Sequence, residues 1–419
     1  MNPIDELRAV IEENFPDYWP AVDLCLATCA TLLLADNVNP TAVVLVGAPA
    51  TGKTTVASMF EDAVVRSVGG ELVKLVYRSD NFTPAAFVSQ ASNRTAAELS
   101  KIDLLPKIKD KVLLTPELAP IFRGKDDELA ESFSRLTRVL DGQGYTSDTG
   151  THGQRGYVGR YIFAWIGCTT PFAPGVWRVM SQLGSRLFFL LMDTEQETTI
   201  DDLLKDPGKS YVERCRECKE AVHALLLTLF EKHGGIASVS WDPKRDDPRS
   251  RLWLARCAAL LARMRTIPKE EHDRAPGERI TYLPVAPEGP YRALTVLTNV
   301  ARGHALVHGR SMVTLVDLPL VARVTLSSMP TDAGRILRAL VDSGTLTTEQ
   351  VKRAIGARSP ETARRQMAYL HALGVARFDE PGMGKAATLS FLPEWDWCAS
   401  SEFRALLEGE PVSAEGVCV

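Results

Sequence analysis

The chain has 419 residues, of which 45% are hydrophobic and 24% charged, and its formal net charge is −4. These are the values of an ordinary globular protein, so they exclude a disordered chain, a collagen-like repeat and a disulfide miniprotein. The small negative charge also argues against general electrostatic binding of nucleic acid, so any such contact needs a local basic patch. At about 150 residues per domain, this length predicts two or three domains.

Neither the start of the chain nor its longest apolar stretch indicates a membrane or an export signal. The apolar stretch 24–35 is shorter than the roughly 18 to 20 residues that a membrane-spanning helix needs. The start, Met-Asn-Pro-Ile-Asp-Glu, lacks the basic-then-apolar order of a signal peptide. We therefore expect a cytoplasmic protein that has no membrane partner.

The cysteines do not form a recognisable framework. Eight cysteines in a chain of this length are too few for a disulfide scaffold. Cys25 and Cys29 are spaced one helical turn apart in an apolar helix, which indicates core positions. Cys215 and Cys218 form one Cys-x-x-Cys pair with no second pair of ligands nearby, so a structural role is favoured over metal or redox use.

The first half of the chain alternates between predicted helices and strands. Residues 1–40 have apolar positions at helical spacing. Five short apolar runs are predicted as strands, at 41–46, 71–77, 111–114, 161–166 and 187–192. Helices are predicted between them, at 54–68, 125–140 and 176–183. Strands that alternate with helices predict a three-layered α/β domain with a parallel sheet.

A phosphate-binding motif follows the first predicted strand. The pattern G-x-x-x-x-G-K-[ST] is matched by Gly47, Ala48, Pro49, Ala50, Thr51, Gly52, Lys53 and Thr54. In such a loop the backbone N–H groups surround phosphate oxygens, and the helix that follows adds its positive dipole end. We expect Lys53 to contact the β and γ phosphates and Thr54 to ligate Mg²⁺, with Thr55 completing the site. The sequence therefore predicts that ATP and Mg²⁺ bind here.

Polar residues at the ends of later strands are candidates for hydrolysis. A magnesium-holding Asp usually ends the third strand of such proteins, but Thr115 stands at that place. Glu117 is the only carboxylate at that strand end, and we assign it the activation of the attacking water; the alternative is a structural, capping Glu. Asp80, after the second strand, is a second candidate for holding the metal. Thr170, after the fourth strand, can touch the γ-phosphate or the water.

An arginine precedes the fifth predicted strand. Arg186, at the start of that strand, can reach the γ-phosphate of a neighbouring subunit and offset the charge of the transition state. The alternative is a plain surface arginine.

The order of these motifs resembles that of the AAA+ ATPases. Within them it is most similar to the group that includes the MCM helicases, the MoxR-type ATPases and the bacterial enhancer-binding activators. Four segments carry the resemblance: the Walker A loop 47–54, the glycine-rich segment 140–160, the arginine-finger segment 183–193 and the lid-like segment 289–317. Thr115 and Thr170 depart from the group's usual Asp and Asn, which bears on the hydrolysis rate more than on nucleotide binding.

The resemblance, which covers residues 40–330, implies further roles. It implies an ATPase that assembles as a homo-oligomeric ring, such as a hexamer, with Arg292 in the lid as sensor 2. It also implies that the glycine-rich segment is a hairpin in the central pore that grips DNA or a peptide. The basic and polar residues of that hairpin are His152, Gln154, Arg155 and Arg160. The alternative is a solvated loop.

Residues 331–397 have a pattern similar to a winged helix. An amphipathic segment, 332–343, precedes a second helix that begins at Thr347 with Gln350 as its capping-box partner. Ser359 caps a third helix, which has Pro360 at its first position. Two predicted strands, 376–378 and 386–391, flank a turn.

The third helix and the turn carry the candidate DNA contacts of this module. They are Arg358, Arg364 and Arg365, near the start and outer side of the helix, and Lys385 on the wing. Acidic residues nearly balance the basic ones across the module, so docking to a protein is the alternative.

The sequence therefore predicts an AAA+ α/β domain at 1–195, a helical lid at 196–330, a winged helix at 331–405 and a flexible tail at 406–419. The expected function is ATP-driven work on DNA, in replication, recombination, a mobile element or defence. Two alternatives are a MoxR-like protein remodeller and a slow, nucleotide-gated assembly switch.

Overall fold

The computed structural model describes residues 2–67, 69–89, 94–149, 153–184, 186–192, 200, 208–272, 280–283, 286–380 and 386–410. The chain separates into two compact units. The first unit is Met1–Asp247 with Thr298–Thr314, and the second is Pro248–Leu297 with Leu315–Val419. The expected lid region, 196–330, contributes to both units, and the predicted domain boundaries stay predictions.

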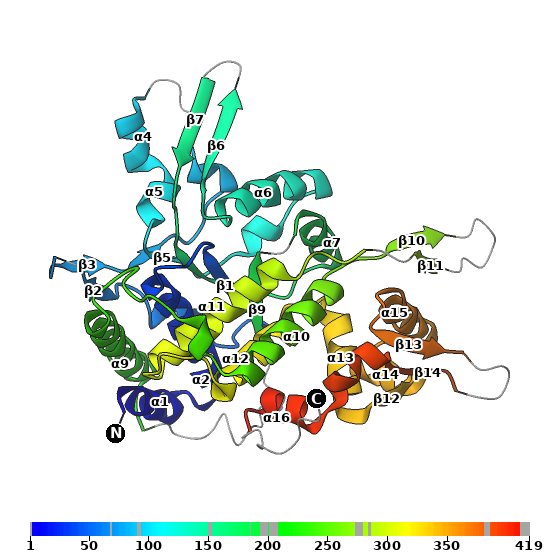
Figure 1. The fold of residues 1–419 in the computed structure, drawn as a ribbon. Coiled ribbons are helices and arrows are strands. Elements are labelled where there is room, and N and C mark those ends of the chain that lie inside the picture. Colours follow the sequence, from blue (N-terminus) through cyan, green and yellow to red (C-terminus); the bar gives the residue numbers. More distant parts are fainter. Residues whose placement is uncertain are drawn as a thin grey trace. The chain divides into compact units, whose positions relative to one another are not determined.

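A five-stranded parallel sheet forms the centre of the first unit (Figure 1). Across the sheet the strands are β4 (Val76–Arg78), β5 (Val112–Thr115), β8 (Ala164–Thr169), β1 (Thr41–Val46) and β9 (Leu187–Leu191). Each neighbouring pair is parallel, which confirms the predicted parallel α/β fold, and the fold is compatible with a P-loop NTPase. From β1 the chain passes to the far edge at β4, returns through β5 and β8, and then adds β9 on the other side of β1. Ligands of such sheets bind at the carboxyl ends of the strands, where the strand order reverses.

Helices surround this sheet. They are α1 (Pro3–Asn14), α2 (Trp19–Ala30), α3 (Lys53–Ser58), α4 (Ala96–Ile102), α5 (Leu104–Ile108), α6 (Asp126–Val139), α7 (Pro174–Leu183) and α9 (Tyr211–Lys232). All residues of α2 except Pro20 are buried, and α2 packs against β1 and β8. A helix that is apolar on every side is expected in such a buried position.

Two antiparallel hairpins accompany the sheet. One joins β2 (Val64–Arg66) to β3 (Leu72–Lys74), and the other joins β6 (Gly144–Thr149) to β7 (Gly153–Val158). The second hairpin is the glycine-rich segment, and it projects away from the sheet at the top of Figure 1. His152, which we expected in this segment, lies outside the described residues.

Three sequence-based boundaries are wrong. The predicted helix 54–68 ends at Ser58, since the β-branched pair Val64 and Val65 forms strand β2 instead. The predicted strand 71–77 is divided between β3, which pairs with β2, and β4, which joins the sheet. The predicted strand 161–166 begins and ends three residues later, as β8. Gly167, Cys168 and Thr169 lack the strong apolar character that marks a buried strand.

The second unit combines helices with two small antiparallel sheets. Its helices are α10 (Pro248–Met264), α12 (Leu318–Ser327), α13 (Thr331–Ser343), α14 (Thr348–Ala354), α15 (Pro360–Ala372) and α16 (Ser401–Glu408). A hairpin joins β10 (Lys269–His272) to β11 (Ile280–Leu283), and a three-stranded sheet has the order β12 (Thr345–Thr347), β14 (Thr388–Phe391), β13 (Ala376–Asp379). Helix α11 (Tyr291–Val307) contributes to both units.

The structure confirms the capping residues that were predicted for two helices in residues 331–397. The Thr347 hydroxyl accepts a hydrogen bond from the backbone N–H of Gln350, and the Gln350 side chain accepts from the backbone N–H of Thr347. The Ser359 hydroxyl caps α15 by accepting a hydrogen bond from the backbone N–H of Thr362. The chain also packs beyond residue 405, because α16 runs to Glu408 and buries Leu406 and Leu407. None of the described helices is long and apolar enough to cross a membrane.

Candidate nucleotide-binding site

The phosphate loop lies between the buried strand β1 and the helix α3, as the motif predicts. Gly52 has a left-handed backbone (φ 84°), and a Cβ at this position would overlap the ring of Tyr18. Both constraints require glycine here. Ala50 also has a positive φ, of 66°. Backbone conformations of this kind in a non-glycine residue are uncommon, and they cluster at functional sites.

The Lys53 ammonium is held at this loop. Its Nζ donates hydrogen bonds to the carbonyl oxygens of Gly47 (2.8 Å) and Ala48 (2.5 Å) and to the hydroxyl of Thr51 (3.2 Å). Lys53 is 8% exposed, whereas Thr54, the next residue, is exposed. The Lys53 contacts with these loop atoms are all made to neutral oxygens. Phosphate oxygens are stronger acceptors for an ammonium group, because both partners are then charged.

Aromatic side chains lie beside the loop, and sequence reasoning missed them. Tyr18 stacks on Phe15 with 5.0 Å between ring centroids, and Arg214 lies 4.3 Å over the Phe15 ring. The Tyr211 hydroxyl is 2.8 Å from the hydroxyl of Thr55. Burial raises the pKa of Tyr18, and the nearby Tyr211 adds to this rise. Only the tertiary fold brings these residues to the loop, so no local pattern could have identified them.

At the end of β5, Thr115 stands where a nucleotide site usually has a metal-holding Asp, and the packing of its side chain explains this difference. Thr115 is 1% exposed, and its hydroxyl accepts a hydrogen bond from the indole N–H of Trp165 at 3.2 Å. The side chain of Thr115 is therefore committed to the core. A threonine satisfies this buried donor without adding a charge, whereas an aspartate would place a carboxylate inside the sheet.

Glu117 lies next to the loop but has a local contact of its own. Its carboxylate accepts a hydrogen bond of 2.9 Å from the backbone N–H of Ala119, at the start of the 3-10 turn η4 (Ala119–Phe122). The Glu117 side chain is exposed. The capping role that we kept as an alternative is thus present in the structure, and the proposed activation of water stays a prediction.

Cys168 connects Glu117 to the phosphate loop. The thiol of Cys168 donates to the Lys53 carbonyl at 3.4 Å, and its own carbonyl accepts from the Leu118 N–H at 2.7 Å. Burial raises the pKa of Cys168 to about 12; Lys53 opposes this rise and Glu117 adds to it. Lys53 and Glu117 therefore both act electrostatically on the same buried thiol.

Thr170 directly follows the strand that adjoins the loop. The carbonyl of Thr169 accepts from the N–H of Gly47 at 3.3 Å, which fixes the start of the loop to the end of β8. The structure thus brings Gly47, Lys53, Glu117 and Thr170 to one end of the parallel sheet. Asp80 is exposed, and its carboxylate pairs with Arg78 at 2.7 Å.

Arg186 lies at the other end of the sheet, because it precedes β9 and all five strands are parallel. Its guanidinium pairs with Asp141 at 3.0 Å and donates to the Gly184 carbonyl at 2.9 Å. The Arg186 and Asp141 side chains are only 14% and 15% exposed. Arg186 cannot serve the loop of its own chain, so its role toward a neighbour stays a prediction. Arg292 lies in the second unit, and its sensor role also stays a prediction.

The candidate DNA contacts have unequal exposure. On the β6–β7 hairpin, Arg155 is half-buried, and the exposed Arg160 lies 3.5 Å from Asp110. Arg358, Arg364 and Arg365 are exposed in the second unit.

The side chain of Arg365 already has a partner within the second unit. Burial raises the pKa of Tyr282 on β11, and Arg365, which hydrogen-bonds with that tyrosine, opposes the rise. Lys385 lies outside the described residues.

Cys215 and Cys218 both lie on α9. Cys218 is buried, and burial raises its pKa to about 11. Within the described ranges these two thiols do not belong to a cluster of three metal-ligating side chains. The structural role that we favoured for this pair stays a prediction.

In comparisons with known proteins, no family model and no curated protein matches the chain.

Proposed function

We propose that the chain binds ATP with Mg²⁺ at residues 47–55 and hydrolyses it slowly, as a member of the AAA+ type. The observation that carries this proposal is the placement of Lys53 at a complete phosphate loop, where the strand order reverses. Bound phosphates would replace the loop carbonyls as partners of Lys53. The exposed Thr54 would ligate the metal.

The end of β5 supports slow rather than fast hydrolysis. The Thr115 hydroxyl is bound to Trp165, so it is not directed toward a metal. Glu117 remains the best candidate for activating the water, since it is exposed and, like Lys53, acts electrostatically on Cys168. A carboxylate that already caps a turn would have to share its oxygens between the two roles.

We further propose that the ATPase acts on DNA. The order helix, strand, two helices and two strands in α13–β14 supports a winged helix, in which α15 would enter a groove. Arg358 and Arg364 are exposed near the start of α15. The packing of β11 against α15 occupies part of that helix's surface and leaves less of it for a DNA groove; docking to a protein is the alternative.

Titration with a fluorescent ATP analogue tests the nucleotide site. Lys53→Ala should weaken binding roughly 10- to 150-fold, since a hydrogen bond to a charged group contributes about 1.5–3 kcal/mol. Lys74→Ala is the matched control, because Lys74 is an exposed lysine on β3. Equal affinity in the wild type and in Lys53→Ala would refute the site.

A size measurement with and without ATP and duplex DNA tests the rest of the proposal. ATP should increase the particle size if the chain assembles into a ring, and DNA should bind in a salt-dependent manner. A particle that binds one protein partner but no DNA would instead support the remodeller.

A further inference from the structure

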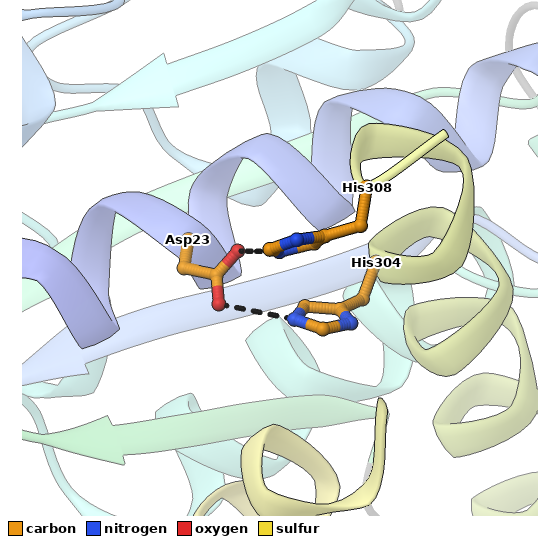
Figure 2. Close-up of side chains that lie close together, drawn as sticks. All are labelled: Asp23, His304 and His308. Carbon is orange, nitrogen blue, oxygen red and sulfur yellow. Dashed lines mark hydrogen bonds and ion pairs between the residues drawn. The ribbon is translucent and has the colours of Figure 1, made fainter. Parts of the chain in front are cut away.

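Three potential metal ligands meet between two helices of the first unit. Asp23 lies on α2, and His304 and His308 lie one turn apart on α11 (Figure 2). A Cβ on Gly303 would overlap the backbone carbonyl of Ala27, so glycine lets the two helices approach closely there. Asp23 precedes Ala27 by one turn of α2, and His308 follows His304 by one turn of α11. The two helices therefore run in opposite directions where they cross.

The three side chains converge on one point. The Nε2 atom of His304 is 3.2 Å from one carboxylate oxygen of Asp23, and the Nε2 atom of His308 is 3.4 Å from the other. The two imidazole rings lie face to face at a tilt of 36°, with 4.2 Å between centroids. One ligand atom from each residue lies within 4.8 Å of the others. Both histidines thus present the same ring nitrogen to the same carboxylate.

The site is buried on the side of Asp23 and open on the side of His308. Asp23 is 7% exposed and His304 is 6% exposed. The side chain of His308 is 23% exposed, so water can reach the cluster from there.

This arrangement calls for one positive charge beside Asp23, which either a proton on one histidine or a divalent cation supplies. A buried carboxylate is costly without a compensating cation. Protonating both histidines would place two positive rings 4.2 Å apart, which Coulomb repulsion disfavours. A single divalent cation between the three groups would neutralise the carboxylate and accept the lone pairs of both neutral imidazoles.

The separations also fit a metal. Zinc bonds to His nitrogen and Asp oxygen are about 2.0–2.2 Å long, and neighbouring ligand atoms of a tetrahedron are then about 3.3–3.6 Å apart. The observed separations of 3.2 and 3.4 Å, each to a different oxygen of Asp23, lie close to this range.

We propose that Asp23, His304 and His308 bind a zinc-class divalent cation, with water as the fourth ligand on the exposed side of His308. Two imidazoles and one carboxylate suit Zn²⁺ better than Mg²⁺ or Ca²⁺, which prefer all-oxygen sites. The cation links α2, which packs under β1 and β8, to the part of α11 that belongs to the same unit. Its role is structural, because binding to the folded state stabilises that state.

Metal titration of the full-length protein tests this proposal. The chain is first stripped with a chelator and then titrated with Co²⁺, whose visible absorption reports tetrahedral coordination, followed by displacement with Zn²⁺. We expect one equivalent of metal per chain at this site and a higher melting temperature with Zn²⁺. His308→Gln should weaken the affinity at least about tenfold and abolish most of the thermal shift.

Two controls separate this cluster from other ligands. His371→Gln changes a histidine of the second unit, and Cys215→Ser with Cys218→Ser removes the thiol pair of α9; both should bind metal as the wild type does. Unchanged affinity in His308→Gln, loss of binding in the cysteine variant, or absence of binding in the wild type would each overturn the proposal.

X-ray absorption of the zinc-loaded wild type gives an answer that does not depend on any variant folding. The spectrum should show two imidazoles and light-atom ligands at about 2.0–2.2 Å. Sulfur at about 2.3 Å would place the metal elsewhere and reject the site.

Discussion

The ends of strands β1 and β5 are unequally equipped for nucleotide chemistry. After β1, residues 47–54 match the phosphate motif at every defined position, and Lys53 is held by three oxygens of the loop. After β5, Thr115 is bound to a core indole and Glu117 caps a turn. The difference teaches that the two proposed activities have separate origins in the sequence: nucleotide binding would depend on eight consecutive residues, and hydrolysis on distant strand ends.

The packing of β5 against β8 explains why the end of β5 lacks a metal-holding acid. Leu113 of β5 is paired with Trp165 of β8, and Thr115 is paired with Gly167. Trp165 is buried, and its indole N–H needs an acceptor. A Cβ on Gly167 would overlap Leu118, which covers this part of the sheet. The buried indole of Trp165 thus favours a small hydroxyl residue at position 115, where a metal-holding aspartate is usual.

The largest effect is expected from Thr115→Asp. Its carboxylate would be buried beside Trp165 without a cation, which should lower the free energy of unfolding of the first unit by about 3–5 kcal/mol. Turnover should not rise. Thr115→Val, which keeps the shape but leaves the buried indole N–H of Trp165 without this acceptor, should cost about 1–3 kcal/mol. Chemical denaturation measures both variants, and a stable, faster Thr115→Asp protein would show that the position can hold a metal.

Glu117→Gln should separate catalysis from capping. The glutamine oxygen can still accept from the Ala119 N–H, but the amide cannot accept the proton of the attacking water. We expect ATP affinity and stability to be retained and turnover to fall by about a factor of 100. Asp80→Asn is the matched control, because Asp80 is exposed and paired with Arg78. If only Asp80→Asn lowers turnover, the catalytic role belongs to Asp80.

The ion pair of Arg186 allows a two-part test. Arg186→Ala should lower stability by about 1–2 kcal/mol, because Asp141 then loses its 3.0 Å ion pair and its contact with Arg138, at 3.4 Å, is longer. Arg186→Ala combined with Asp141→Asn should recover part of that stability but not the lost turnover, if Arg186 acts on a neighbour's phosphate. Calorimetry and a phosphate-release assay measure the two properties. Full turnover in the double variant would restrict Arg186 to a structural role.

The sequence predicted elements whose signal is local. Strands β1 and β9 and helix α6 lie within about one residue of their predicted bounds, because each is a buried apolar run or an amphipathic helix. The helix after the phosphate loop was predicted ten residues too long, since neither the turn after Ser58 nor the pairing of β2 with β3 follows from periodicity.

Site residues follow the same rule. The phosphate loop is contiguous, so its eight residues are visible in the sequence. Tyr18 reaches the loop only because α1, α2 and α9 pack together. The His304 and His308 spacing of one turn is visible in the sequence, but Asp23 lies 285 positions before His308, and no pattern links the two.

The smallest expected effect concerns DNA, and it compares two sets of arginines. Arg358→Ala with Arg364→Ala should lower the slope of log affinity against log salt by about 2 units, at roughly 0.9 unit for each lost phosphate contact. Arg365→Ala should change it less, because Arg365 already contacts Tyr282. ATP turnover without DNA should stay the same in all these variants, since none of the three arginines lies in the first unit.

A slope that is unchanged in the double variant would mean that α15 does not meet phosphates. The same titration with Arg155→Ala and Arg160→Ala then decides whether the β6–β7 hairpin carries the charge. Arg160 already lies near Asp110 at 3.5 Å, so Arg155 should account for the larger share of any change. If neither pair alters the salt slope, no DNA contact remains among the proposed arginines. The packing of β11 on α15 would then favour a protein as the partner of this module.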